Sequence, residues 1–136
     1  MTPEVLASEK AAIAELIARY NFAIDHNDFQ GWADCFTPDG VFDGMIGRFA
    51  AHGELDRFTA DVKRLTADTP NLRHYVTNIM TEVDRDSAYP RCFLMMTSIT
   101  KEEGAKVMIT GEYEDRLVKH NGQWLFNSRK VHMDGA

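Results

Sequence analysis

The chain has 136 residues, of which 44% are hydrophobic and 26% charged, and 21 acidic residues outnumber 15 basic ones to give a formal charge of -6. This length and composition are typical of one globular domain, residues 1–136, which can bury a core without disulfides or metal. No segment gathers basic residues into a stripe, so we expect no nucleic-acid partner.

The N-terminal segment predicts one long amphipathic helix. Thr2 and Pro3 suit the N-cap and the first helical position. Apolar residues then recur at helical spacing, at Ile13, Leu16, Ile17, Tyr20 and Ile24. Acidic residues from the fourth position onward interrupt any apolar run, so we expect neither a signal peptide nor a membrane span, and a cytoplasmic location by default.

The polar cluster from Asp25 to Asp28 marks the end of this helix. Its last members can cap a second, short helix that carries Phe29, Trp32, Ala33 and Phe36 on one face. Thr37-Pro38-Asp39-Gly40 predicts a turn, followed by a short strand at 41–43 and a loop with Gly44 and Gly47. Helical spacing of apolar residues from Gly53 to Asp68 predicts a third helix.

The rest of the chain is β in character. We predict strands at 72–83, 91–100, 106–119 and 123–131, with Pro90 at the start of the second and an Asn121-Gly122 type I′ hairpin turn before the last. Alternation along the first of these strands places His74 and Asn78 on one face. Three N-terminal helices packed on a curved antiparallel sheet give an α+β fold of cone shape, whose apolar interior suits a small ligand.

Several motifs resemble those of SnoaL-like proteins in the NTF2-like superfamily. They are Tyr20-Asn21-Phe22-Ala23-Ile24-Asp25, Trp32 with Phe36-Thr37-Pro38-Asp39-Gly40, Arg73-His74-Tyr75-Val76-Thr77-Asn78, Gly111-Glu112-Tyr113-Glu114-Asp115, and Asn121-Gly122-Gln123-Trp124 with Arg129. The resemblance covers nearly the whole chain and implies the cone-shaped cystatin/NTF2-like α+β barrel. It is closest to the branch with scytalone dehydratase and bile acid 7α-dehydratase.

In that branch an Asp at the end of the first helix pairs with a His on the sheet, which implies the catalytic residues Asp25 and His74. Two tyrosines that face the ligand in the bile acid enzyme correspond to Tyr20 and Tyr113. The second His of scytalone dehydratase has no counterpart in the stretch 92–96. That departure puts scytalone itself in doubt as the substrate.

The chemistry of these side chains supports the same interpretation. A His accepts protons near neutral pH, and a carboxylate can orient its ring and stabilise the imidazolium. A Tyr hydroxyl can polarise a carbonyl or protonate a leaving hydroxyl. Other roles stay open, because His74 can be a hydrogen-bonded structural residue and Asp25 lies off the apolar stripe of an ideal helix, where it can act as a polar helix end or a cap.

Further candidates for contact with a substrate are Asn78, Arg129, Trp32, Phe42 and Phe58. Arg129 can bind a ligand carboxylate or neutralise a nearby acid. We expect Cys35 and Cys92 to be buried free thiols. The histidines are scattered without the spacing of metal ligands, so we expect no metal and no cofactor.

The sequence therefore predicts a cofactor-independent lyase of the dehydratase type, or an isomerase, acting on a small cyclic or polycyclic alcohol or ketone. The alternatives are a non-catalytic ligand-binding protein and a structural small subunit of a ring-hydroxylating dioxygenase. Apolar residues such as Tyr75 and Ile79 on the outer sheet face indicate a homodimer or homotrimer.

Overall fold

A computed structural model describes residues 1–136. Three helices precede most of the sheet in the chain. The helices are α1 (Pro3–Asp25), α2 (Phe29–Ala33) and α3 (Leu55–Leu65), and the strands are β1 (Phe36–Gly44), β2 (Gly47–Ala50), β3 (Arg73–Asp84), β4 (Ser87–Thr100), β5 (Gly104–His120) and β6 (Gln123–Met133).

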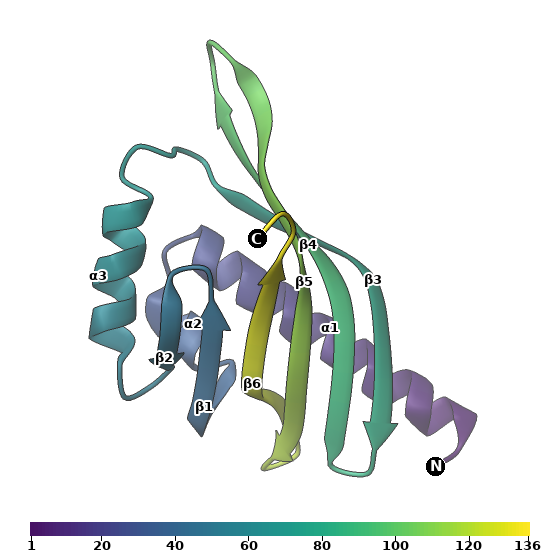
Figure 1. The fold of residues 1–136 in the computed structure, drawn as a ribbon. Helices are drawn as coiled ribbons and strands as arrows, with labels where there is room; N and C mark the ends of the chain where they lie inside the picture. Colours follow the sequence, from purple (N-terminus) through teal and green to yellow (C-terminus); the bar gives the residue numbers. More distant parts are fainter.

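The six strands form one sheet in the order β2-β1-β6-β5-β4-β3. All neighbouring strands are antiparallel except β1 and β6, which are parallel. Helix α1 crosses one face of the sheet, α3 lies beside β2, and the β4–β5 hairpin extends beyond the remaining strands (Figure 1). The predicted α+β class, with helices packed on a curved sheet, is confirmed. No helix combines the length and the hydrophobicity needed to cross a lipid bilayer.

Helix α1 begins and ends as the sequence predicts. The Val5 backbone N–H donates to the Thr2 hydroxyl oxygen at 3.1 Å, which caps the first turn. At the other end the chain turns sharply, because Asn27 adopts a positive φ of 58°. Asp28 then accepts a hydrogen bond from the Gly31 N–H at 2.9 Å and starts α2. Asp25 is therefore the last residue of α1, at the corner between two helices.

The first two strands differ from the prediction. Residues 37–40, predicted as a turn, lie within β1. Phe36 pairs with Phe126 and Val41 pairs with Ser128, so a longer stretch of β1 faces a shorter stretch of β6. The turn-forming residues thus form an irregular stretch within the strand. The predicted loop around Gly44 and Gly47 is a tight hairpin to β2, where Gly47 adopts a φ of 125°.

A bulge in β3 changes which side chains face inward. Thr77 pairs with Phe93 and Met80 with Arg91, so β3 carries one residue more than β4 between these pairs. Asn78 lies in this bulge with a φ of 59° and is exposed. The predicted alternation from His74 therefore does not continue to Asn78.

Strand β4 also begins earlier than predicted, at Ser87. Pro90, expected at the start of the strand, lies within it opposite Thr81. Because proline has no N–H, β4 lacks one ladder donor at this position. The Asn121-Gly122 turn agrees with the prediction, since both residues have positive φ, 53° and 79°.

The helices pack on the sheet through a cluster of aromatic rings. The fully buried Trp32 of α2 stacks on Phe58 of α3, with ring centroids 3.8 Å apart and an interplanar angle of 3°. Phe42 of β1 meets both rings edge-on, at 5.7 and 5.8 Å. This cluster holds α2 and α3 against β1, next to the candidate site described below.

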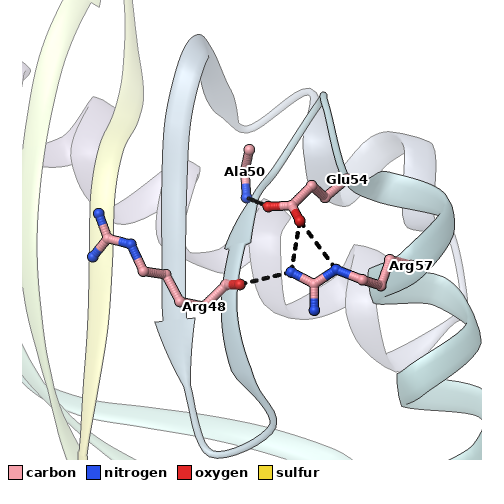
Figure 2. Close-up of polar contacts among 4 residues, drawn as sticks. All are labelled: Arg48, Ala50, Glu54 and Arg57. Carbon is pink, nitrogen blue, oxygen red and sulfur yellow. Dashed lines mark hydrogen bonds and ion pairs between the residues drawn. The ribbon is translucent and has the colours of Figure 1, made fainter.

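Polar contacts hold the start of α3 on β2 (Figure 2). The Glu54 carboxylate accepts from the Ala50 N–H at 2.8 Å and from Nη2 of Arg57 at 2.7 Å. The same guanidinium donates to the Arg48 carbonyl oxygen at 2.9 Å and lies 4.0 Å from the Phe49 ring centroid. These bonds lower the pKa of Glu54, the Ala50 N–H being the main cause.

Removal of the Trp32 ring tests the importance of the aromatic cluster. We expect Trp32→Ala to lower the free energy of unfolding by ~3–5 kcal/mol, because the ring leaves a large cavity between α2 and α3. Urea denaturation followed by circular dichroism measures this change. Met80→Ala on the exposed outer face is the control and should stay within about 0.5 kcal/mol of the wild type. Equal effects of the two substitutions would contradict the assignment.

Candidate active site

The structure brings Asp25 and His74 into direct contact. Nδ1 of His74 lies 2.6 Å from Oδ1 of Asp25, and the His74 backbone N–H donates to Oδ2 of the same carboxylate at 2.8 Å. Both side chains are largely enclosed, with 17% of the His74 side chain and 6% of the Asp25 side chain exposed. One carboxylate therefore holds both the backbone and the ring of His74.

Two local features produce this contact. Asp25 is the last residue of α1 and lies one turn after the buried Asn21, at the edge of the helix face that packs on the sheet. His74 lies near the start of β3, before the bulge at Asn78, where its side chain points to the same side as the half-buried Val76. The prediction that these two groups meet is thus confirmed in geometry, although they are 49 residues apart.

The contact determines how the His74 ring is oriented. Because a carboxylate accepts the hydrogen on Nδ1, the neutral ring presents the lone pair of Nε2 on its other side. Nε2 makes no hydrogen bond within the chain, and His74 lines a cavity. A base with a free nitrogen, fixed by a carboxylate, is the arrangement that proton abstraction requires.

The cavity has a volume of about 600 Å³, which lies in the range of small-molecule sites. Most of its wall is apolar. Of the predicted site residues, Tyr20, Asp25, Phe42, Phe58, His74 and Tyr113 line it. A larger depression of about 1290 Å³ is lined mainly by polar and charged residues and contains neither Asp25 nor His74, so we place the site in the smaller cavity.

The two tyrosines lie in the most enclosed part of the cavity wall. Burial raises the pKa of Tyr20 to about 12 and holds the pKa of Tyr113 well above its usual value, although Arg129 opposes both shifts. Both phenols are therefore neutral hydrogen-bond donors at physiological pH. Their rings pack edge to face, with centroids 6.4 Å apart.

Arg129 does not line this cavity, in contrast to its predicted contact with a substrate. Its side chain is completely buried, and Nε donates to Oδ1 of Asp115 at 3.1 Å. The guanidinium lies 3.4 Å from the ring centroid of Tyr113 and 4.4 Å from that of Tyr20. Of the two roles left open by the sequence, neutralising a nearby acid is the one observed. Arg129 packs behind the tyrosines.

The Asp115–Arg129 pair is incompletely hydrogen-bonded. Oδ2 of Asp115 and Nη1 of Arg129 are buried without a partner in the chain. Burial raises the pKa of Asp115 to about 6, with Arg129 opposing the shift. Burial is the largest single effect on the pKa of Arg129 and lowers it, but Asp115 together with Tyr113, Tyr20 and Cys92 outweighs burial and holds that pKa above its ordinary value.

Two other predicted contact residues also lie away from the cavity. Trp32 is behind Phe58, on which it stacks. Asn78 is in the exposed bulge of β3. Cys35 and Cys92 are buried free thiols, as predicted, and burial raises the pKa of each to about 11. No three His, Cys, Asp or Glu side chains cluster as possible metal ligands.

Four methionines that were not predicted as site residues also line the cavity, namely Met45, Met96, Met108 and Met133. Alternation along β4 could have indicated Met96, which shares the parity of the buried Leu94. Met45 falls in the segment predicted as a loop, and Met133 lies beyond the predicted end of the last strand. No pattern in the sequence indicated that Met45 and Met133 line the cavity.

The Asp115–Arg129 pair predicts a pH dependence of stability. The folded pKa of Asp115, about 6, exceeds its reference value of 3.8, so the native state binds more protons than the unfolded state between these values. This contribution to stability is present below about pH 4 and is lost as the pH rises through about 6.

Asp115→Asn should remove that contribution and retain an acceptor for Arg129. We expect the wild-type free energy of unfolding, minus that of the variant, to fall by on the order of a few kcal/mol between about pH 4 and pH 7. Urea denaturation at a series of pH values measures the difference. A difference that is constant or rises with pH would contradict the raised pKa.

Solved structures share this fold. A protein of unknown function from Mycobacterium tuberculosis, solved as an Asp-to-Asn variant, is 35% identical with a TM-score of 0.85, over 98% of this chain and 77% of that one. A candidate scytalone dehydratase from Novosphingobium aromaticivorans is 21% identical with a TM-score of 0.78, over 97% and 88% of the two chains. The beta subunit of a candidate aromatic-ring-hydroxylating dioxygenase from the same organism is 16% identical with a TM-score of 0.81, over 97% and 93%.

A structure from Nostoc punctiforme described as having a cystatin-like fold is also similar, at 24% identity and a TM-score of 0.79, over 96% of this chain and 94% of that one. The comparison with curated proteins gives no match. The family model described as a SnoaL-like domain matches residues 6–130 of this chain. Together with the 35% identical relative, this match shows that the chain belongs to the SnoaL-like family, as its motifs predicted.

Proposed function

We propose that this protein is a cofactor-independent lyase of the dehydratase type, or an isomerase, that acts on a small cyclic or polycyclic alcohol or ketone. The observation that carries the proposal is the contact of 2.6 Å between Asp25 and Nδ1 of His74, which leaves Nε2 free in a residue that lines the cavity. A candidate scytalone dehydratase has a similar fold, and this likeness supports the proposal.

In this mechanism His74 is the general base. Nε2 accepts a proton from the carbon next to a ring carbonyl, and the electron pair of that C–H bond moves into an enolate. The ring becomes an imidazolium, which the Asp25 carboxylate stabilises through the hydrogen bond to Nδ1. The carboxylate is already in place before the reaction, so no reorganisation is needed when the charge forms.

The tyrosines supply the acid side of the reaction. The hydroxyl of Tyr20 or Tyr113 donates a hydrogen bond to the enolate oxygen. In a dehydration the enolate expels the hydroxyl group of the neighbouring carbon, the proton from His74 converts it to water, and a C=C bond forms. In an isomerisation the same proton returns to a different carbon. Both reactions are balanced without an oxidant, a reductant or a metal.

The alternatives do not use the dyad. A non-catalytic binding protein needs the cavity alone. A structural subunit, like the dioxygenase beta subunit of similar fold, needs neither the cavity nor a base. The feature that these alternatives leave unused is the free Nε2 of His74, in a residue that lines the cavity.

Two probes test the reaction type. A β-hydroxytetralone forms a fluorescent naphthol when it loses water, and a β,γ-unsaturated cyclohexenone changes its ultraviolet absorbance when it becomes conjugated. We expect the wild type to turn over at least one of them. His74→Gln and Asp25→Asn should lower kcat/KM by about 100- to 10,000-fold, the usual contribution of general acid-base catalysis.

The chain offers a matched control for the dyad. His132 on β6 contacts Glu114, with Nε2 2.8 Å from Oε1, but this second pair is exposed and lines no part of the cavity. His132→Gln and Glu114→Gln should keep wild-type kcat/KM. Thermal melting of all four variants separates loss of catalysis from loss of fold. Turnover by His74→Gln at the control rate would refute the assignment of the base.

We also propose that the protein self-associates through the outer face of the sheet, as a dimer or a trimer. Tyr75 and Met95 are directly opposite each other on β3 and β4, and both are exposed together with Phe93. Paired charges of both signs lie next to these apolar side chains, at Arg91 and Glu112. Such a surface can be complementary to a second copy of itself.

A charge at the centre of this surface should disrupt the association. We expect Phe93→Glu, at a position 51% exposed, to shift the protein to a monomer in analytical ultracentrifugation, because like charges would face each other across the interface. Phe22→Glu on α1 is the matched control and should keep the wild-type mass. A monomeric wild type would contradict this assignment.

A further inference from the structure

The cavity wall contains one arginine that no acid of the chain neutralises. Arg73 is the only Lys or Arg among the residues that line the cavity, and it is exposed. None of the ion pairs of the chain includes it. The chain has 21 acidic residues against 15 basic ones, so acids are in excess, yet this cation has no acidic partner. Its positive charge is therefore available to a ligand.

The backbone places the Arg73 guanidinium beside the Asp25–His74 contact. Strand β3 lies at the edge of the sheet, and the His74 N–H bonds outside the sheet, to Oδ2 of Asp25 at 2.8 Å. In a strand, the N–H and C=O groups of alternate residues point to the same edge, so the carbonyl of Leu72, immediately before β3, points the same way. Nη1 of Arg73 donates to that carbonyl at 2.7 Å. The guanidinium therefore lies on the edge of β3 that faces the end of α1.

The side of the guanidinium that suits a carboxylate is free. Nη1 is bonded to the Leu72 carbonyl, whereas Nε and Nη2 make no hydrogen bond within the chain. These two nitrogens present parallel N–H donors that match the two oxygens of a carboxylate. The Asp25 carboxylate does not use them, because both of its oxygens are bonded to His74. The bond to Leu72 also restricts the side chain before any ligand binds.

Two asparagines add neutral donors near this cation. Asn27 follows Asp25 by two residues, and Asn71 precedes Arg73 by two residues. Both line the cavity and are exposed. The Asn71 amide donates one hydrogen to the Ile99 carbonyl oxygen at 3.2 Å and keeps the second. The arginine and both asparagines of the lining thus come from the two chain segments that carry Asp25 and His74.

We infer that Arg73 anchors a carboxylate of the ligand, so that the substrates of this site are carboxylic acids of cyclic alcohols or ketones. The formal charge of -6 repels anions at long range, so selectivity for an acid has to arise from this local contact. The inference deepens the proposed function by adding a charged group to the substrate class. It rests on that proposal only for the location of the site.

A matched pair of naphthalenes tests this inference. β-Naphthoic acid is ionised at neutral pH, and β-naphthamide has a similar shape without the charge. We expect the wild type to bind the acid about three- to tenfold more tightly in isothermal titration calorimetry, and Arg73→Gln to bind the two compounds about equally. Equal affinity in the wild type, a preference that persists in Arg73→Gln, or binding of neither compound would overturn the inference.

Two further variants separate a local contact from a general effect of charge. Arg73→Lys keeps the charge but loses the planar pair of donors, so it should retain only part of the preference for the acid. Arg19→Gln removes an exposed arginine of α1 that does not line the cavity, and it should keep the wild-type preference. Equal losses of preference in Arg19→Gln and Arg73→Gln would overturn the role of Arg73.

The same measurement on His74→Gln separates this inference from the proposed function. We expect the variant to keep the preference for the acid, because the preference resides in Arg73. If the wild type turns over neither the tetralone nor the cyclohexenone but prefers the acid through Arg73, the catalytic proposal fails and the carboxylate anchor stands. If it turns over one of these probes but binds both naphthalenes equally, the carboxylate anchor fails alone.

Discussion

The site depends on one carboxylate that joins the end of a helix to the start of a strand. Asp25 accepts one hydrogen bond from the His74 backbone and one from its ring. A buried carboxylate is costly unless its oxygens are satisfied, and here both oxygens are satisfied by the same residue. The interaction therefore stabilises the corner between α1 and β3 and also orients the imidazole ring of His74. No separate supporting residue is needed to fix the ring.

The fold contains a second buried carboxylate that serves a different purpose. Asp115 pairs with Arg129, but neither atom left unpartnered reaches the cavity. This pair supports the tyrosine rings from behind, because the guanidinium lies against Tyr113. The two pairs differ in their relation to the cavity: His74 has a free nitrogen in a residue that lines it, whereas Arg129 is fully buried and lines no part of it.

Much of this architecture could be predicted from local patterns. Helix caps, helical spacing and the Asn121-Gly122 turn act through neighbouring residues, so the sequence identified them. The bulge at Asn78 could not be predicted, because one inserted residue reverses the alternation and depends on pairing with β4. The prediction of a turn at residues 37–40 was wrong for a similar reason, since turn-forming residues are also tolerated in an irregular strand. The role of Arg129 could not be decided from the sequence, because it depends on the position of Asp115.

The prediction of the dyad itself came from the family resemblance and not from periodicity. An ideal helix places Asp25 off the apolar stripe, but the buried face of α1 is wider than that stripe, because Asn21, one turn before Asp25, is buried as well. The polar residues after Asp25, which marked the end of the helix, also provide the left-handed turn at Asn27. The same few residues thus end α1 and begin α2. The contact between Asp25 and His74 therefore lies at the boundary of α1, where the chain leaves the helix and turns into α2.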